Sequence, residues 1–474
     1  MKLGELLKGV KIREINADLN TEVKGLCYNS KDCHEGYGYF ARKGFKYDGF
    51  LFIPTCFKRG VSVFFGEEAL SGYPFVVVDN IREAQALISA NFYGNPQRFL
   101  KLVGVTGTNG KTTTCYLLKD ALNSGLISTV EIDTGKRLEK ARLTTPESTD
   151  IFCYLKEMVE SGKQYAVIEV SAHALTFKRV HGMKFDSVVF TGFSRDHLDF
   201  YKTMDNYFKA KASLFGFLKG NGFCVVNGDV DVFDRLVPLC KNPICVGKGE
   251  RCHIKIKRIV EEASSLFIDY LIGGKEVSIN FPMIGEYNAY NLGFALGVLS
   301  GFNIATKGFI ERVSQAFSVP GRVEVINSGK GFKVIIDFAH TPEGLDKLLH
   351  SLKKHCKNKL ITVFGCGGER DKTKRPLMLE SVCKHSDLVF VTADNPRGES
   401  IEDIFNDIKK GRDFKKQVTY IKDRKEAIFE AIDQAGEGDL VVIAGKGHED
   451  YQIIGETPIP FNDKQVALEA LGLV

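Results

Sequence analysis

The sequence predicts an α/β protein of three domains with mostly parallel sheets. Short apolar runs, each followed by a polar or helical stretch, recur along the 474 residues, for example at 165–170, 185–191 and 222–227. Such alternation is typical of a parallel sheet with helices on its faces. Domains usually contain about 100 to 200 residues, so a chain of this length corresponds to roughly three of them.

The pattern along the chain indicates where the three domains lie. Residues 1–87 alternate short strand-like runs with glycine-rich turns, and predict a small N-terminal α/β domain. The larger unit with the three runs named above extends over residues 88–320, until the pattern breaks around Pro320 and Gly321. Residues 321–474 begin a second series, which predicts a C-terminal Rossmann-like domain with buried strands at 333–337, 360–365, 388–392 and 440–444.

Composition and charge exclude several classes of protein. The apolar share of 44%, the charged share of 26% and the net charge of +5 are those of an ordinary globular protein, without a charge bias that predicts nucleic-acid binding. No apolar stretch approaches the roughly 18 residues of a membrane span, so we expect no membrane insertion and a cytoplasmic location. The twelve cysteines form no Cys-x-x-Cys pair, and the spacing of Cys240, Cys245, Cys252 and His253 fits no common zinc module.

A glycine-rich turn at the end of an apolar strand predicts a phosphate-binding loop. Residues 103–114 read Val-Gly-Val-Thr-Gly-Thr-Asn-Gly-Lys-Thr-Thr-Thr and lead into a helical pattern. Glycines allow backbone N–H groups to point at an anion, Lys111 adds a cation for the outer phosphates, and the Thr112 hydroxyl is placed for Mg²⁺. The central domain is therefore expected to be a P-loop-type ATPase domain, with ATP bound by Gly107, Thr108, Asn109, Gly110, Lys111, Thr112 and Thr113.

Polar side chains follow two further strands of the central domain. Strand 165–170 delivers Glu169 and is followed by Ser171, while strand 185–191 is followed by a segment that contains His197. A carboxylate and an imidazole at neighbouring strand ends beside a phosphate loop are suited to holding Mg²⁺ against ATP. Together with Lys111 and Thr112, these residues predict a metal site.

The strands of the C-terminal domain also end in small, polar or charged residues. In open α/β sheets ligands bind beyond the carboxyl ends of the strands. Four segments are therefore expected to share one cleft, namely Asp337, 365–370, 394–397 and 445–449.

These and other motifs occur in an order that resembles the Mur ligase family of ATP-dependent amide ligases, and within it the tripeptide synthetases of peptidoglycan synthesis. The resemblance runs from about Leu26 to Glu449. It rests on Gly-Thr-Asn-Gly-Lys-Thr-Thr at 107, Thr-Thr-Pro-Glu at 144, Glu-Val-Ser-Ala-His-Ala-Leu at 169, Asp-His-Leu-Asp at 196, Asn-Ala-Tyr-Asn at 288, Pro-Gly-Arg at 320, Asp-Phe-Ala-His-Thr-Pro at 337, Gly-Cys-Gly-Gly-Glu-Arg-Asp at 365, Asp-Asn-Pro-Arg at 394 and Gly-Lys-Gly-His-Glu at 445.

The resemblance implies roles for individual residues in ATP and metal binding. Asn288 and Asn291 would lie near the adenine, and Arg322 and Asp337 would reach phosphate and ribose from the last domain. Glu169 and His197 would ligate Mg²⁺ with Thr112. Lys211 aligns with a lysine that the family carries as a carbamate, a CO₂ adduct (N6-carboxylysine) whose anion can ligate the metal; Lys209 is the local competitor. The implied catalytic residues are Lys111, Glu169, His197 and Lys211.

The resemblance also implies two further substrates. UDP-MurNAc-L-Ala-D-Glu would be bound by Ser30, Thr144, Thr145, Ser171 and Arg179, although Asn29-Ser30-Lys31 stands where the family has Asp-Ser-Arg. The amino acid, meso-diaminopimelate, would be bound by Arg370, Asp394, Asn395, Pro396, Arg397, Gly445 and Glu449. Two local departures are Gly192-Phe193 in place of Asn-Leu and Ser400 in place of proline.

The expected activity is therefore ATP-dependent addition of meso-diaminopimelate to UDP-MurNAc-L-Ala-D-Glu through an acyl phosphate, by a chain that acts as a monomer. Three alternatives stay open at this point. They are an enzyme of the same kind that adds L-lysine, a ligase similar to folylpolyglutamate synthetase, and a regulatory ATPase without a peptide substrate.

Overall fold

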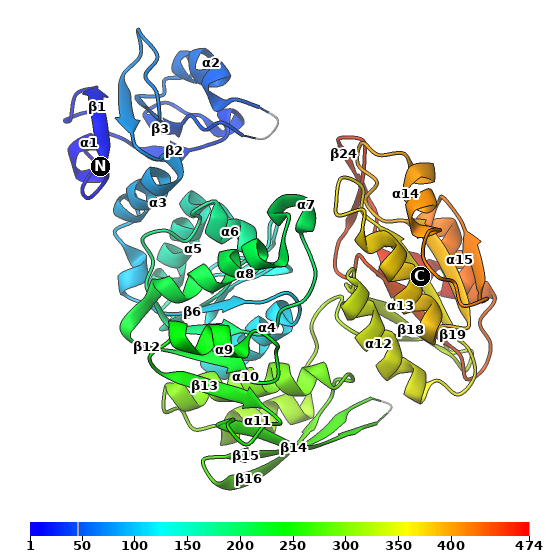
Figure 1. Ribbon diagram of the computed structural model, residues 1–474. Helices are drawn as coiled ribbons and strands as arrows, with labels where there is room; N and C mark the ends of the chain where they lie inside the picture. The colour runs from blue at the N-terminus through cyan, green and yellow to red at the C-terminus, as the bar shows by residue number, and fades with distance from the viewer. Residues whose placement is uncertain (45–46, 263, 474) are drawn as a thin grey trace. The chain divides into compact units, whose positions relative to one another are not determined.

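The structure of the protein is a computed structural model, which describes residues 1–44, 47–262 and 264–473. The chain forms two compact units. Unit 1 comprises Met1–Thr106, Leu122–Val188 and Ala210–Phe223, and unit 2 comprises Gly107–Ala121, Val189–Lys209 and Cys224–Val474. Helices and parallel-rich sheets alternate in both, which confirms the predicted α/β class (Figure 1). The three expected domain ranges stay a prediction.

The first sheet of unit 1 lies in the N-terminal segment. Its strands follow the order β1-β5-β4-β3-β2, and all neighbouring pairs are parallel except β1 with β5. Helices α1 (Leu3–Leu6) and α3 (Ile81–Phe92) pack on one face, and α2 (Ile53–Lys58) packs on the other. The strands are β1 (Ile12–Asn16), β2 (Gly25–Cys27), β3 (Tyr37–Phe40), β4 (Val63–Gly66) and β5 (Phe75–Val78).

A second group of strands in unit 1 carries Glu169. Strand β10 (Tyr165–Glu169) lies between β6 (Lys101–Thr106) and β7 (Gly125–Ile127), parallel to both. All three are almost entirely buried, as expected for strands of a parallel sheet. The antiparallel strands β8 (Glu131–Asp133) and β9 (Leu138–Lys140) extend this group beyond β7. Strand β11 (Phe185–Phe190) and helices α5 (Ser148–Glu160) and α6 (Ala172–Thr176) complete it.

Unit 2 begins with the phosphate loop and contains helix α10 (Tyr287–Gly301), which packs on β13 and β14. Strand β12 (Leu218–Asn227) pairs in parallel with β13 (Pro243–Gly247), and β13 pairs in parallel with β14 (Ile254–Glu261). An antiparallel meander of β14, β15 (Leu266–Ile272) and β16 (Lys275–Phe281) follows. The sequence patterns did not predict this meander.

The C-terminal part of unit 2 is a six-stranded sheet in the order β17-β18-β22-β19-β20-β21. All neighbours are parallel except β17 with β18. Helices α12 (Pro342–His355), α13 (Lys374–His385) and α14 (Ile401–Ile408) cover one face, and α15 (Arg424–Asp433) and α16 (Asp463–Leu471) cover the other (Figure 1). The strands are β17 (Glu324–Asn327), β18 (Lys333–Asp337), β19 (Leu360–Cys366), β20 (Leu388–Ala393), β21 (Gln417–Tyr420) and β22 (Leu440–Ala444).

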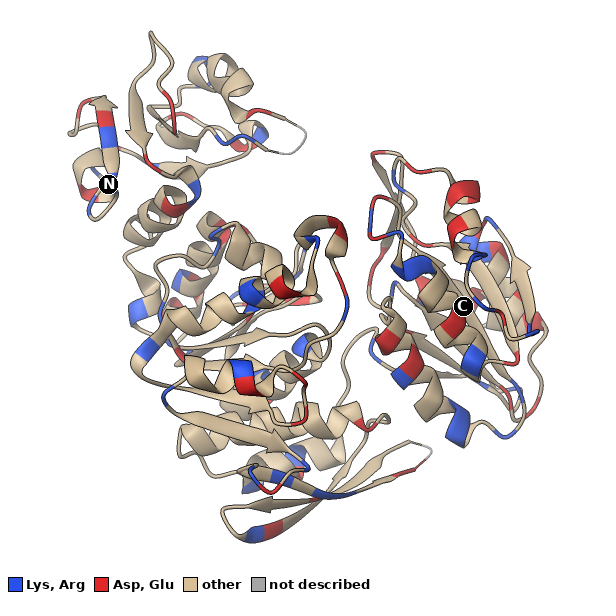
Figure 2. Cartoon of the chain, in the orientation of Figure 1, with Lys and Arg blue, Asp and Glu red and all other residues tan. Residues whose placement is uncertain are grey.

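The four strands predicted here are therefore confirmed, within a three-layer doubly wound fold. Figure 2 shows basic and acidic residues interspersed on its helices. In the described part of the chain, no helix is long and apolar enough to cross a membrane. The other described elements are η1 (Ser30–Asp32), η2 (Gly49–Phe52), η3 (Pro96–Arg98), α4 (Lys111–Leu122), α7 (Leu198–Tyr201), α8 (Met204–Ala212), η4 (Ser213–Phe217), α9 (Phe233–Leu236), η5 (Val237–Leu239), α11 (Lys307–Gln315), β23 (Tyr451–Ile454) and β24 (Thr457–Pro460).

Candidate functional site

The loop between β6 and α4 adopts a conformation that only glycine fits. Gly107 has φ 143° and Gly110 has φ 83°, both in the region that disfavours L-residues. A Cβ atom at Gly107 would lie 2.1 Å from Thr191 Oγ1, and one at Gly110 would lie 2.4 Å from Asn291 Oδ1. The loop is thus a cradle of backbone at the start of a helix, which is the arrangement that binds phosphate groups.

Hydrogen bonds to the segment 191–194 fix the loop. Thr108 N donates to Gly192 O over 2.9 Å, and Thr191 Oγ1 donates to Asn109 O over 2.6 Å. Lys111 Nζ donates to Thr108 O over 2.8 Å, so its ammonium folds back over the loop. Gly192, a departure from the family pattern, contributes through its backbone carbonyl, which any residue could supply.

A cavity of about 520 Å³ opens beside this loop. Its volume lies within the range of roughly 300–1,000 Å³ that is common for small-molecule sites. Its wall includes Asn109, Gly110 and Thr113 from the loop and first turn of α4, Asn288 and Asn291 from α10, Arg322 and Asp337, and Lys347, His350 and Lys354 from α12. Seven of the eleven residues predicted to bind ATP therefore line one cavity, whereas Gly107, Thr108, Lys111 and Thr112 are not part of its wall.

Asn288 and Asn291 are held by a chain of hydrogen bonds. Asn291 Nδ2 donates to Asn288 Oδ1 over 2.8 Å, and Asn288 Nδ2 donates to Ile284 O over 2.7 Å. Both residues are buried in the wall of the cavity. Their amide groups thus have fixed orientations, as a site that distinguishes one base from another requires.

Arg322 and Asp337 lie in the same wall, and the charge of Arg322 acts on the Asp337 carboxylate. Asp337 Oδ2 accepts from Val323 N over 2.8 Å, and Oδ1 accepts from Ala339 N over 2.7 Å. Burial raises the pKa of Asp337, while Arg322 and the two N–H groups oppose that rise. The guanidinium of Arg322 lies 4.5 Å from the centre of the Phe338 ring, and its buried Nε has no hydrogen-bond partner. That unused donor fits an anionic ligand in the cavity.

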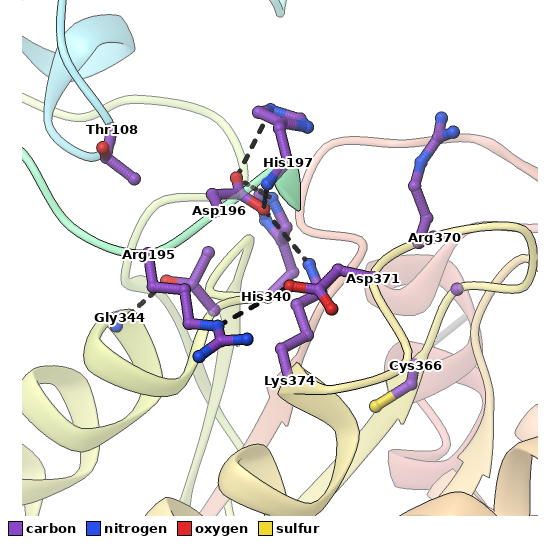
Figure 3. Close-up of polar contacts among 12 residues, drawn as sticks. Thr108, Arg195, Asp196, His197, His340, Gly344, Cys366, Arg370, Asp371 and Lys374 are labelled. Carbon is purple, nitrogen blue, oxygen red and sulfur yellow. Dashed lines mark hydrogen bonds and ion pairs between the residues drawn. The ribbon is translucent and has the colours of Figure 1, made fainter. Parts of the chain in front are cut away.

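A second charged cluster surrounds Asp196 (Figure 3). Lys374 Nζ and His197 Nε2 each lie 3.4 Å from its carboxylate, and His340 Nε2 lies 4.0 Å from it. Burial alone would raise the pKa of Asp196, but Lys374, His197 and His340 hold it well below its usual range. His197 has a left-handed backbone, with φ 54°, and its N–H donates to Asp196 Oδ1 over 2.9 Å. The cluster thus joins the predicted metal ligand His197 to the start of α13.

Unit 1 brings together the residues predicted to bind the peptide end of the UDP precursor. Thr145 Oγ1 donates to Glu169 O over 2.7 Å and accepts from Ser171 N over 3.0 Å. Arg179 Nη1 donates to Thr145 O over 2.8 Å. Thr144 Oγ1 accepts from Thr129 Oγ1 over 3.1 Å, and Thr129 N donates to Glu169 Oε2 over 3.0 Å. These six residues therefore form one hydrogen-bonded group.

The predicted ligands Lys211 and Ser30 both lie in short helices. Lys211 is buried in α8, and Ser30 lies in η1, where its carbonyl accepts from Arg59 over 2.7 Å. Glu169 and Lys211 belong to unit 1, whereas Thr112 and His197 belong to unit 2. Within the described ranges, no three His, Cys, Asp or Glu side chains are grouped as a metal site. Of the four predicted metal ligands, only Glu169 and His197 are of those residue types. The metal site therefore stays a prediction.

The strand ends of the six-stranded sheet meet as the sequence predicted. Gly445 N donates to Asp337 O over 3.0 Å, and Asn395 Nδ2 donates to Glu449 Oε2 over 3.0 Å. The buried Lys446 Nζ also donates to Glu449, over 2.7 Å. Asp394, Asn395, Pro396 and Gly445 are buried, so the segments 394–397 and 445–449 form a largely buried, hydrogen-bonded floor.

The side chains of Arg397 and Arg370 lie near each other, both beside Gly367. Arg397 has φ 53°, and its Nη1 donates to Gly368 O over 2.8 Å and to Asn395 O over 3.3 Å. Burial lowers the pKa of Arg397, and the nearby cation of Arg370 lowers it further. Two arginines that repel each other are stabilised by a carboxylate between them, as planar two-pronged pairing provides.

Sequence reasoning missed three of the residues in these clusters. Lys374 and His340 surround Asp196, and Lys446 supports Glu449. His340 and Lys446 lie inside motifs that the sequence did single out, but no pattern indicated which neighbours they contact. Lys374 follows the motif at 365 in a run of charged residues, which normally indicates a solvated surface.

Family models agree with the motifs. A model described as Mur ligase middle domain matches residues 105–299, and one described as Mur ligase, glutamate ligase domain matches residues 321–447.

Full-length relatives and solved structures extend this similarity. The chain is 40% identical over 456 residues to a protein of Aquifex aeolicus named UDP-N-acetylmuramoyl-L-alanyl-D-glutamate--2,6-diaminopimelate ligase, covering 95% of this chain and 94% of the relative. It is 38% identical to the protein of the same name from Caldanaerobacter subterraneus subsp. tengcongensis, covering 99% of each. A solved structure titled with that name is 28% identical, with a TM-score of 0.67 over 100% of this chain and 99% of the other. MurF ligase from Thermotoga maritima in complex with ADP shares the fold, with a TM-score of 0.68 at 19% identity over 95% and 97%.

Proposed function

The chain belongs to the Mur ligase family, and we propose that it is the ATP-dependent ligase that adds 2,6-diaminopimelate to UDP-MurNAc-L-Ala-D-Glu in peptidoglycan precursor synthesis. Both curated relatives described above carry that activity in their names and align over almost the whole chain. The alternative of a regulatory ATPase has no relative of that kind among them. The folylpolyglutamate-like alternative is disfavoured by the 394–397 and 445–449 segments.

The observation that carries this proposal is the glycine cradle beside the cavity of about 520 Å³. The cradle can adopt this conformation only because Gly107 and Gly110 lack Cβ atoms, which would collide with Thr191 and Asn291. The cavity wall supplies fixed amides at Asn288 and Asn291, and Arg322 offers an unused donor. These features fit ATP, whose adenine and phosphates need a shaped pocket and concentrated positive charge.

The reaction transfers the γ-phosphoryl group of ATP to the D-glutamyl γ-carboxylate. A carboxylate oxygen forms the new P–O bond as the bond to ADP breaks, and an acyl phosphate results. The amino group of diaminopimelate then attacks the carbonyl carbon, a proton is lost from nitrogen, and phosphate leaves. Lys111 and Arg322 would hold negative charge on the phosphoryl oxygens, so the protein contributes positioning and electrostatics.

When bound, Mg²⁺ would neutralise charge on the phosphates. We propose Thr112, Glu169, His197 and a carbamate on Lys211 as the residues that hold it. Carboxylate, carbamate and hydroxyl oxygens are ligands that Mg²⁺ prefers. The side chain of Lys211 is buried, and burial favours the neutral amine that reacts with CO₂.

The amino acid would bind over the floor formed by residues 394–397 and 445–449. Arg397 and Arg370 would pair with the distal carboxylate of the meso isomer, and Asp394 and Glu449 would accept from its ammonium group. Burial raises the pKa of Glu449, with Lys446 opposing, so an incoming ammonium would favour the charged carboxylate. L-Lysine lacks the distal carboxylate and would leave Arg397 without its partner.

The UDP precursor would lie along unit 1. Ser30 would contact the uridine diphosphate, and Thr144, Thr145, Ser171 and Arg179 would hold the muramoyl dipeptide next to Glu169. We also propose a cytoplasmic location, because all twelve cysteines are free thiols and the reaction consumes ATP. A monomer remains our expectation for the assembly state.

ADP release across a panel of precursors and amino acids tests this function. We expect full turnover only when UDP-MurNAc-L-Ala-D-Glu and 2,6-diaminopimelate are both present, with the tripeptide product seen by mass spectrometry. Omission of either substrate is the control, and UDP-MurNAc without peptide tests the acceptor. ADP release that is equally fast without the precursor would contradict the proposal and favour a regulatory ATPase.

A further inference from the structure

Glu147 in unit 1 is the common partner of three arginines that come from separate segments. Its carboxylate lies 2.6 Å from Arg42 Nη1, 2.9 Å from Arg179 Nη2 and 4.0 Å from Arg82 Nη1. Arg42 follows strand β3, Arg82 lies in the first turn of α3, and Glu147 directly precedes α5. We call these four residues the arginine cluster.

The arginine cluster carries more positive than negative charge. Its three guanidinium groups face one carboxylate, which leaves two cations in excess. Asp150 lies nearby and reduces the excess to one if it is ionised, but it is bound by Tyr28 Oη over 2.5 Å. Two other carboxylates near Arg82 are engaged elsewhere: Glu67 accepts from Ile81 N over 3.0 Å, and Glu83 pairs with Lys178 over 3.1 Å.

The excess charge is poorly solvated. The side chains of Arg42 and Arg179 are 15% and 14% exposed, and that of Arg82 is 24% exposed. The Nε atom of Arg179 is buried and has no hydrogen-bond partner. Burial lowers the pKa of Arg82, and the cations of Arg42 and Arg179 contribute to that shift. A group of partly buried, mutually repelling cations with an unused donor is a binding site for an oxyanion.

The arginine cluster is connected to the peptide-binding residues of unit 1. Arg179 Nη1 donates to the Thr145 carbonyl over 2.8 Å, and Thr145 Oγ1 donates to the Glu169 carbonyl over 2.7 Å. Arg42 Nη1 also donates to Gln85 Oε1 over 2.9 Å, and Gln85 in turn donates to Thr149 in α5. The arginine cluster is therefore connected through Thr145 to Glu169, one of the proposed metal ligands.

We propose that Arg42 and Arg82 act with Arg179 to hold an oxyanion of UDP-MurNAc-L-Ala-D-Glu, and that Glu147 fixes the orientation of their guanidinium groups. This inference rests on the proposed function. The precursor offers two oxyanions of suitable chemistry, the α-carboxylate of its D-Glu residue, which does not react, and its diphosphate. Arg42 and Arg82 are then specificity-determining residues for the acidic precursor, and neither takes part in phosphoryl transfer.

Arg42→Gln tests the proposal, with Arg137→Gln as the matched control. Arg137 also pairs with a glutamate in unit 1, Glu157, but it lies outside the arginine cluster. We expect Arg42→Gln to raise KM for the precursor by about 10- to 100-fold, the effect of losing a hydrogen bond to a charged group. KM for ATP and for diaminopimelate should stay within about twofold, since the charge lost is local. Arg137→Gln should change none of the three constants.

A modified precursor and UDP alone identify which oxyanion the arginine cluster binds. With a precursor whose D-Glu α-carboxylate is converted to a carboxamide, wild type and Arg42→Gln should show the same KM if the cluster binds that carboxylate. If the cluster binds the diphosphate, the difference should persist, and calorimetry should show weaker binding of UDP alone to Arg42→Gln. A stable Arg42→Gln protein with an unchanged precursor KM would overturn the proposal.

A purely structural role is also testable. If Arg42→Gln lowers Tm, Arg82→Gln replaces it, because Arg82 makes the longer contact with Glu147. A rise of all three KM values in parallel with a loss of Tm in both variants would show that the cluster only supports the fold. Calorimetric titration of the precursor into wild type keeps this test separate from the proposed function. If the precursor binds but is not ligated, the ligase activity is refuted. Titration of the precursor into Arg42→Gln then still tests whether the arginine cluster binds it.

Discussion

Arg322 donates a hydrogen bond to Thr112 over 3.1 Å, although 210 residues separate the two in the sequence. Thr112 lies in the first turn of α4, directly after the phosphate cradle, and Arg322 lies directly before β17 of the six-stranded sheet. Burial raises the pKa of Asp337, and the same guanidinium opposes that rise. One side chain thus connects the phosphate loop with the carboxylate predicted to contact ribose.

Arg322→Ala should therefore reduce activity strongly. The change removes the cation that faces a buried carboxylate, which costs about 2 to 5 kcal/mol in comparable pairs. That corresponds to a loss of roughly tens to thousands of fold in kcat/KM for ATP. Steady-state ADP release measures it. Arg312→Ala is the control, because Arg312 is about half exposed and pairs with Asp120. Equal kcat/KM in both variants would rule out the role of Arg322.

Lys111→Ala should abolish ligation and leave the fold intact. Lys111 lies over the phosphate loop and donates to Thr108 O, so its loss removes positive charge from the transferred phosphoryl group. We expect kcat to fall by about a thousandfold or more, as when an electrostatic contact to the transition state is lost. Tm should change little, as measured by thermal denaturation. Lys119→Ala, two turns along α4, should keep wild-type turnover. Normal kcat in Lys111→Ala would be incompatible with the account.

Lys211→Ala should be nearly inactive if a carbamate on Lys211 holds the metal. Small carboxylates such as acetate should restore part of the activity, because they can occupy the space of the missing carbamate. Lys209→Ala is the matched control: it lies on the same helix, but its side chain is 70% exposed and pairs with Asp205. Activity assayed in CO₂-depleted buffer is the readout. Full activity of Lys211→Ala there would exclude the carbamate.

Acid should destabilise the C-terminal sheet domain through Glu399. The hydrogen bond from Arg375 lowers the pKa of Glu399 from 4.5 to about 2, with further help from Lys372. A depressed folded-state pKa contributes stability that is present above pH 4.5 and is lost as the pH falls toward 2. That contribution is up to about 3 kcal/mol of unfolding free energy.

Urea unfolding at about pH 7 and pH 3 measures this contribution. Glu399→Gln should be less stable than wild type at the higher pH and should lose less stability on acidification. Glu437→Gln is the control, because Glu437 lies in the same domain and is exposed. Identical pH dependence of Glu399→Gln and wild type would refute the assignment.

The sequence predicted most strands that carry the site. The segments 333–337 and 440–444 coincide with β18 and β22, because each is a continuous run of buried, mostly β-branched residues between polar ends. Parallel strand ends meet at one edge, so the closeness of Asp337 to Gly445 followed from the pattern alone. The glycines at 107 and 110 likewise predicted the phosphate-binding loop from the sequence alone.

Contacts between distant segments could not be predicted. Lys374 and Asp196 are 178 residues apart, and nothing local distinguishes Lys374 from the surface lysines around it. The β14–β16 meander was missed because its half-exposed strands mix charged and apolar residues, unlike the buried parallel strands. Ser400 stands where the family usually has proline. Its side chain caps α14 by accepting from Asp403 N over 3.3 Å, and the sequence did not predict this cap.

The central claim is that this chain adds diaminopimelate, and the ratio of kcat/KM for meso-diaminopimelate to that for L-lysine tests it most directly. The account predicts that wild type prefers meso-diaminopimelate by roughly tens to thousands of fold, since lysine would leave the partly buried Arg397 without its carboxylate. Arg397→Ala should lose most of that preference, whereas Arg412→Ala, at an exposed position, should retain it. Equal use of both amino acids by wild type, or an Arg397→Ala variant that keeps the preference, would contradict the account.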